Sequence, residues 1–185
     1  MGDVVTARLV LHPMSAADAE RLLARAPLPA DRWAAGYPAE VDLVGARNFL
    51  TTCAESGDPG AFGAYEIRRR SDGAAIGGLG FHGPADEEGG VTIGYGLIPS
   101  ARGQGYATEA LRALVDLAWE LGAHSVRGDT SHDNVASQRV MTAVGLRLVA
   151  EDDQLKYYEL HRARHPRAVP APAAPAAPAR RRAPA

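Results

Sequence analysis

The segment from Ile93 to Ala107 contains the residue types that bind a phosphate group. It reads Ile-Gly-Tyr-Gly-Leu-Ile-Pro-Ser-Ala-Arg-Gly-Gln-Gly-Tyr-Ala. A strand ending near Pro99 would lead through a loop into an amphipathic helix, whose first turn presents unpaired N–H groups and a positive dipole end. Gly103 and Gly105 let a ligand approach the backbone, and Arg102 adds a positive charge. The pattern predicts a cradle for a pyrophosphate.

A second glycine-rich segment, residues 78–83, reads Gly-Leu-Gly-Phe-His-Gly and matches the pattern of a dinucleotide-binding turn. That motif works only where it opens a helix inside a βαβ unit. Here Pro84 and an acidic turn follow, so no helix dipole is available for a pyrophosphate. We therefore interpret these glycines as leaving room along an inner strand.

The apolar periodicity predicts the elements that must position these residues. Strands are expected at 6–11, 63–69, 74–81, 91–98, 125–130, 146–150 and 155–160. Helices are expected after an N-cap at Ser15, at 41–54, at about 105–121 and at 134–144, with 27–40 a loop or broken helix. The second helix should turn Leu43, Val44, Ala46 and Leu50 inward. The order indicates an α+β fold around a central mixed sheet.

Composition narrows the class of protein. The 185 residues are 46% hydrophobic and 23% charged, which is typical of a globular chain of one domain. Five of the 20 basic residues lie in 163–185, which leaves 15 basic against 22 acidic residues, a net charge of −7, in 1–162. We expect a domain over 1–162 that does not bind nucleic acid, and a disordered Pro/Ala/Arg tail over 163–185.

Other sequence features indicate the compartment. No apolar run is long enough to span a membrane, and no secretory signal is recognised at the start, so we expect a cytoplasmic protein. Cys53 is the only cysteine, which excludes a disulfide framework and a cysteine-rich zinc site. We interpret Cys53 as a packing residue rather than a nucleophile.

The run Arg102-x-x-Gly105-x-Ala107 resembles the acetyl-CoA motif of the GCN5-related N-acetyltransferase (GNAT) superfamily. The segment Asn134-Val-Ala-Ser137, followed by Gly145, is similar to its second CoA-contacting helix. The opening at 6–13, Thr-Ala-Arg-Leu-Val-Leu-His-Pro, resembles the RimJ/RimL branch, which includes ribosomal-protein N-terminal acetyltransferases. The resemblance covers about residues 6–162.

The resemblance implies a mostly antiparallel sheet of about seven strands, with helices on both faces and a splayed CoA gap between the fourth and fifth strands. It implies acetyl-CoA as co-substrate, no metal, and direct attack of an amine on the thioester. Backbone groups of Leu97 and Ile98 would hold the pantetheine arm, and Asn134 would bond its side. The pyrophosphate would lie on Arg102, Gly103, Gln104, Gly105, Tyr106 and Ala107.

The proton acceptor is left open by the sequence. Only a neutral amine attacks a thioester, so a base is needed. Val91 stands where some relatives carry a glutamate, and Asp129 stands where others carry a carboxylate. Glu88, His82 and a relaying water are alternatives. A structural role is the other interpretation of Asp129, and a lone histidine such as His82 is more often structural.

The proton donor to the leaving thiolate differs from the usual one. Met141 replaces the tyrosine that many relatives place seven residues after the asparagine. Ser137 stands where the RimJ/RimL branch is thought to place a donor, although it could instead satisfy backbone groups. We expect Glu88 and Tyr158 to contact the amine acceptor. The acceptor should lie among residues 27–40, the turn 82–90 and Tyr157. Gly96, often tryptophan in relatives, should widen the gap.

These patterns favour an N-acetyltransferase that acts on a primary amine, either a protein N-terminus or a small amine or antibiotic. The alternative is a non-catalytic acyl-CoA-binding sensor or partner module, which Val91 and Met141 favour. A second alternative is nucleic-acid binding through the arginines of the tail. The branch resemblance is compatible with a homodimer.

Overall fold

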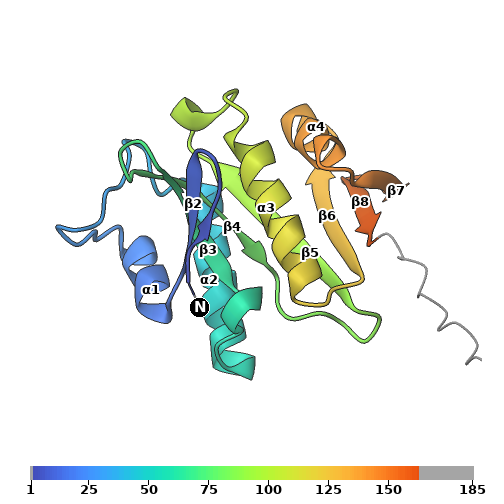
Figure 1. The fold of residues 1–185 in the computed structure, drawn as a ribbon, viewed down its shortest axis with the longest axis horizontal. Coiled ribbons are helices and arrows are strands. Elements are labelled where there is room, and N and C mark those ends of the chain that lie inside the picture. The colour runs from blue at the N-terminus through green and yellow to red at the C-terminus, as the bar shows by residue number, and fades with distance from the viewer. Residues whose placement is uncertain (1, 163–185) are drawn as a thin grey trace, which may run out of the picture.

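The computed structural model describes residues 2–162, which form one sheet with helices on both faces (Figure 1). The strands are β1 (Val4–Val5), β2 (Leu9–Pro13), β3 (Ala64–Arg69), β4 (Ala75–Phe81), β5 (Gly90–Leu97), β6 (Ser125–Ser131), β7 (Arg147–Glu151) and β8 (Leu155–His161). The helices are α1 (Ala16–Ala24), α2 (Glu40–Ser56), α3 (Tyr106–Glu120) and α4 (Val135–Ala143), with 3₁₀ turns η1 (Gly60–Phe62) and η2 (Pro99–Ala101). The predicted tail, 163–185, lies outside the described residues.

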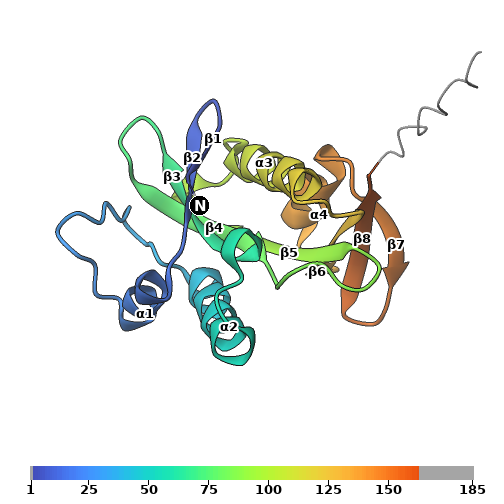
Figure 2. The ribbon, with the colours of Figure 1, turned by 60° about the horizontal axis from the view of Figure 1, so that its bottom comes forward.

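The strand order is β1-β2-β3-β4-β5-β6-β8-β7. Of the described neighbouring pairs, β5 and β6 run parallel and the others antiparallel. Helices α1 and α2 cover one face and α3 and α4 the other (Figure 2). This confirms the expected mixed, mostly antiparallel sheet and its helical layers.

The sheet has eight strands where about seven were expected, because a two-residue strand, β1, comes before the predicted first strand, which itself is displaced from 6–11 to Leu9–Pro13. Val4 and Val5 pair with Leu11 and Val10 across a tight turn. In that turn the Thr6 N–H donates to the Leu9 carbonyl, and the Leu9 N–H donates to Thr6 Oγ1 at 3.0 Å. Residues 6–8 therefore form a turn, and the longer strand begins at Leu9.

Local signals place α1 and α3 where the sequence predicts them. Ser15 and Asp18 form a reciprocal capping box at the start of α1. In α3 the spacing i, i+3, i+4, i+7 buries Leu111, Leu114, Val115 and Ala118 against the sheet. Burying each leucine contributes about 1.5–3 kcal/mol. This packing holds α3 firmly against the sheet, and the loop that precedes α3 therefore leads into a fixed helix.

Helix α2 presents a different face from the one expected. Leu43 and Ala46 are buried and Leu50 is partly buried, as predicted, but Val44 is 44% exposed, and Asp42 and Phe49 are buried in addition. The Asp42 carboxylate accepts the Ala39 N–H, which fixes this residue at the helix start. Gly78 of β4 has no side chain, so Asp42 can lie directly against the strand.

Candidate functional site

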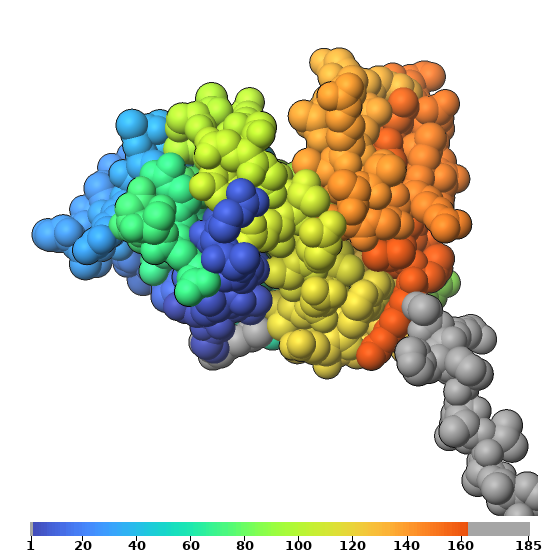
Figure 3. All heavy atoms as spheres, turned by 45° about the horizontal axis from the view of Figure 1, so that its top comes forward, coloured from blue at the N-terminus to red at the C-terminus, as the bar shows by residue number. Residues whose placement is uncertain are grey.

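The sheet opens between β5 and β6. Their pairing is limited to Gly90–Thr92 against Ser125–Arg127, and the later residues of the two strands diverge. Figure 3 shows the resulting groove on the molecular surface, between the segment that starts α3 and the segment around α4. This confirms the splayed gap expected between the fourth and fifth predicted strands.

Part of the β5 backbone faces this gap. The Thr92 carbonyl and the Ile98 N–H both bond toward β4, at His82 and Ile76. Because bonding direction alternates along an antiparallel pair, the amide groups of Tyr95 and Leu97 face the other way, toward the gap. Both backbone groups of Ile98 are engaged, since its carbonyl accepts from Ala101. The Leu97 N–H, rather than either backbone group of Ile98, is thus placed to meet a ligand, while the Leu97 carbonyl accepts from Arg102.

The loop from η2 to α3 has the form expected of an anion cradle. Gly103 and Gly105 both have positive φ, +73° and +78°, and open space surrounds the position of a Gly103 Cβ. Gly105 is the N-cap of α3 and has no capping side chain, so first-turn N–H groups remain available. Arg102 Nε donates to the Leu97 carbonyl at 3.0 Å, which ties the loop to the end of β5.

Arg8 supports this loop from the other end of the chain. Its guanidinium donates to the Gln104 carbonyl at 2.9 Å, pairs with Glu109 at 2.7 Å and stacks on the Tyr106 ring. Glu109 also accepts from the Thr6 hydroxyl at 2.6 Å. Burial alone would raise the pKa of Glu109. Hydrogen bonds from Thr6 and Arg8, together with the positive charge of Arg8, outweigh burial and lower this pKa. Sequence reasoning missed this support, because local spacing gives no sign of contacts about 100 residues apart.

A tyrosine and a serine meet across the groove. The hydroxyl of Tyr95, on β5, lies 2.8 Å from Ser137 Oγ, on the first turn of α4. Burial raises the pKa of Tyr95, partly offset by the hydrogen bond to Ser137. Asn134 Oδ1 caps α4 by accepting the Ser137 N–H at 3.2 Å. Met141 is 1% exposed and packs near Gly128, so it offers no polar group to the groove.

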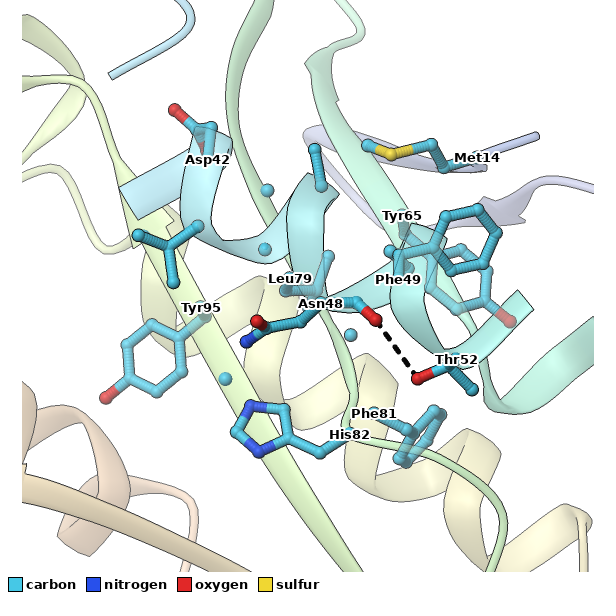
Figure 4. Close-up of a pocket in the computed structure, with 18 of the residues that line it drawn as sticks. Met14, Asp42, Asn48, Phe49, Thr52, Tyr65, Leu79, Phe81, His82 and Tyr95 are labelled. Carbon is cyan, nitrogen blue, oxygen red and sulfur yellow. Dashed lines mark hydrogen bonds between the residues drawn. The ribbon is translucent and has the colours of Figure 1, made fainter. Parts of the chain in front are cut away.

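A cavity of about 430 Å³ lies on the opposite face of the sheet, between α2 and strands β4 and β5. Its lining is mainly apolar and aromatic, and includes Phe49, Phe62 and Phe81. Figure 4 shows His82 and Asn48 pointing into it, while the Tyr95 hydroxyl points away beyond β5. The His82 ring lies over Gly94, where a Cβ would come within 2.8 Å of Nε2.

Asp42 lies at another part of the cavity wall and is 6% exposed. One carboxylate oxygen accepts the Ala39 N–H at 2.8 Å. Burial raises the pKa of Asp42 to about 6, with hydrogen bonding opposing the shift. Sequence patterns do not indicate a role for Asp42, because they predict its position in the helix to be polar surface.

The structure separates the other predicted site residues from the cavity. Asp129 is exposed on β6, opposite Tyr157 on β8. The Glu88 side chain is 87% exposed and lies 3.7 Å from Arg127. Tyr158 is buried and pairs with Gly128, and it is absent from the cavity lining. Of the proposed proton acceptors, the structure brings His82 to the cavity.

The glycines of β4 and β5 serve close packing. A Cβ on Gly80 would lie 2.8 Å from backbone atoms of Gly63 and Ala64, as expected for room along an inner strand. A Cβ on Gly96 would lie 2.4 Å from Val41 of α2. Gly96 therefore faces the cavity and admits Val41, and it does not widen the gap as the sequence suggested.

The fold and these sites define an α+β acyl-transfer domain with a splayed sheet and a glycine loop before a helix. The family model for the acetyltransferase (GNAT) domain matches residues 8–147. The chain belongs to the GNAT acetyltransferase family, whose members use acetyl-CoA.

Relatives and solved structures agree with this assignment. An uncharacterized N-acetyltransferase of Bacillus subtilis, YjdG, is 31% identical over 100 residues, which are 52% of this chain and 58% of that protein. The acetyltransferase structure from Agrobacterium tumefaciens is 25% identical, with a TM-score of 0.62 over 88% of this chain and 95% of that chain. Mycobacterium smegmatis RimJ in complex with CoA-disulfide is 20% identical, with a TM-score of 0.59 over 86% and 84%.

Two further properties concern the described residues alone. No helix within 2–162 is long and apolar enough to cross a membrane. The same residues contain no cluster of three or more His, Cys, Asp or Glu side chains arranged to hold a metal ion.

Proposed function

We propose that this protein transfers the acetyl group of acetyl-CoA to a primary amine by direct attack within a ternary complex. One observation carries the proposal. The sheet opens at β5, with the glycine loop and Ser137 on the α3/α4 face and a cavity containing His82 on the α2 face. Two substrates that enter from opposite faces would meet at this opening.

The residues around the groove fit acetyl-CoA. The first turn of α3 and Arg102 to Ala107 would hold the pyrophosphate. The gap-facing amide groups of Tyr95 and Leu97 would bond the pantetheine arm as an added strand does. The Asn134 side chain uses its oxygen for the α4 cap, which leaves its amide N–H₂ as a donor to the ligand.

The amine would lose its proton to His82. This ring lies at the cavity wall over Gly94, next to the part of β5 that faces the opening. Attack on the thioester forms the amide C–N bond and breaks the C–S bond. Ser137 would donate to the departing sulfur from the other face. Positioning of amine and thioester supplies a further part of the rate.

The cavity favours an acceptor with an apolar group beside its amine. Its lining is dominated by aromatic and aliphatic side chains, and Asp42 is the carboxylate residue among those that line it in the described chain. The acidic turn does not supply charge there, because Asp86 and Glu88 face Arg127. Peptides with an apolar N-terminal residue and small aromatic amines are therefore the acceptors to test first.

The test is acetyl-CoA turnover, measured by thiol release against N-terminal peptides, aromatic amines, aminoglycosides and polyamines, with calorimetric titration of CoA alongside. We expect turnover with apolar amines. His82→Ala should lower kcat at least 10-fold with CoA affinity unchanged, whereas the control His161→Ala, at an exposed site on β8, should leave kcat unchanged. CoA binding without turnover on any amine would instead support the non-catalytic acyl-CoA-binding module.

A further inference from the structure

The Tyr95–Ser137 pair joins two elements that the open sheet otherwise leaves apart. Tyr95 lies on β5 beyond the last residue paired with β6, and Ser137 lies in the first turn of α4. The two hydroxyl oxygens are 2.8 Å apart, and the Tyr95 oxygen is 3.2 Å from the Ser137 carbonyl. Both hydroxyls thus lie on the groove side of the sheet.

Either hydroxyl can donate in this hydrogen bond. Tyr95 has one O–H, and Ser137 Oγ is its nearer acceptor. When Tyr95 donates to Ser137 Oγ, the Ser137 proton is free to point elsewhere. With the Ser137 N–H held by Asn134, the serine is fixed at both its backbone and its side chain.

Helix α4 contains no tyrosine that could donate a proton to the leaving thiolate. Met141 stands where many relatives carry that tyrosine, and it is buried against β5 and β6 near Ile93 and Gly128. A phenol therefore reaches the groove from the strand rather than from the helix. Burial raises the pKa of Tyr95, and the bond to Ser137 only partly offsets this, so the phenol stays protonated at neutral pH while that bond orients it.

We propose that Tyr95 is a positioning residue that aligns Ser137 and replenishes its proton as the CoA thiolate leaves. The inference rests on the proposed function. When the C–S bond breaks, sulfur keeps the electron pair and takes the Ser137 proton. Ser137 takes the Tyr95 proton, and Tyr95 regains one from water. The ammonium nitrogen releases two protons on the opposite face, one to His82 before attack and one to solvent as the amide forms. The proton that Tyr95 takes from water offsets one of these, so the reaction releases one net proton.

The experiment compares Tyr95→Phe, Ser137→Ala and the double variant. Tyr95→Phe should lower kcat about 10-fold, which corresponds to one hydrogen bond to a reacting group. CoA affinity, acceptor KM and melting temperature should stay near the values of the unmodified protein. Because both residues act on one proton, the double variant should be no slower than Ser137→Ala. Ser137→Thr, which keeps the hydroxyl, should retain most of the activity, and only when Tyr95 is present.

A matched control is Thr142→Val. That hydroxyl lies on the same helix as Ser137 and donates to the Gln138 carbonyl at 2.8 Å, but at an exposed position, so its loss should not change kcat. Turnover of Tyr95→Phe within twofold of the unmodified protein, or additive losses in the double variant, would overturn the inference alone. Absence of turnover by the unmodified protein, with CoA still bound, would overturn the proposed function as well.

Discussion

The buried carboxyl group of Asp42 links the stability of the protein to pH. Burial raises its pKa from 3.8 to about 6. Between these values the folded protein holds a proton that the unfolded chain has released, so stability falls as the pH rises through this window. Asp42→Asn removes the titration while its carbonyl can still accept the Ala39 N–H. The free energy of unfolding of this variant relative to the unmodified protein should rise by about 3 kcal/mol between about pH 4 and pH 7.

Urea unfolding at a series of pH values measures this effect. Asp152→Asn is the control of opposite sign, since hydrogen bonds from Tyr157 and two backbone N–H groups lower the pKa of Asp152 to about 2. That variant should be destabilised at neutral pH, and less so as the pH falls below about 4. A stability difference for Asp42→Asn that does not vary with pH would contradict the assignment.

Close packing makes Gly80 a second sensitive position. A methyl group there would lie 2.8 Å from backbone atoms of the neighbouring strand, which cannot move aside as a flexible side chain could. We expect Gly80→Ala to lower the free energy of unfolding by about 1–3 kcal/mol. Gly45→Ala, in α2 with open space around it, should raise stability by about 1 kcal/mol. Equal stability of the two variants in urea unfolding would refute this account of β4.

At the scale of elements, the sequence predicted the strands and helices closely because their signals are local. Ser15 starts α1, Gly122 follows α3, and the periodicity of α3 matches its buried face. The splayed pair followed from the family resemblance, whereas the loop from Arg102 to Ala107 was indicated by its own residues and supported by that resemblance. The sequence did not indicate the two-residue strand β1, which is defined only by pairing with β2.

Contacts between distant segments were outside the reach of local patterns. Tyr95 and Ser137 are 42 residues apart, and Arg8 and Glu109 are 101 residues apart. Asp42 was missed for a related reason, since the face of α2 that is buried depends on the absence of a side chain at Gly78. Each of these residues acquires its role only when the sheet is assembled.

The first turn of α3 depends, through Arg8, on the turn between β1 and β2. Arg8→Ala removes the bond to the Gln104 carbonyl, the stack on Tyr106 and a positive charge beside the loop. CoA should then bind about 10-fold more weakly by calorimetric titration. Arg47→Ala is the control, because Arg47 is similarly exposed but pairs with Glu40 on the opposite face. Unchanged CoA affinity of Arg8→Ala would contradict a role for this support.

At the scale of the whole molecule, the groove and the cavity lie on opposite faces of the sheet, and the proposed function assigns one substrate to each. A ternary complex should give intersecting lines in plots of reciprocal rate against reciprocal substrate concentration, with no acetyl-enzyme formed. Cys53→Ser should keep kcat within twofold, because burial raises the pKa of this thiol and it is absent from the cavity lining. Parallel lines, together with loss of activity in Cys53→Ser, would contradict direct attack.

The short seam between β5 and β6 divides the described sheet into a five-stranded and a three-stranded part. Three residue pairs connect them, aided by the Gly89 carbonyl, which accepts N–H groups of His124 and Ser125. Such parts can open as separate cooperative units. In hydrogen–deuterium exchange we expect β6 and β8 to exchange together and faster than β3 and β4. A ligand lying in the groove would contact both parts of the sheet and hold them together, so it should slow exchange in both units at once.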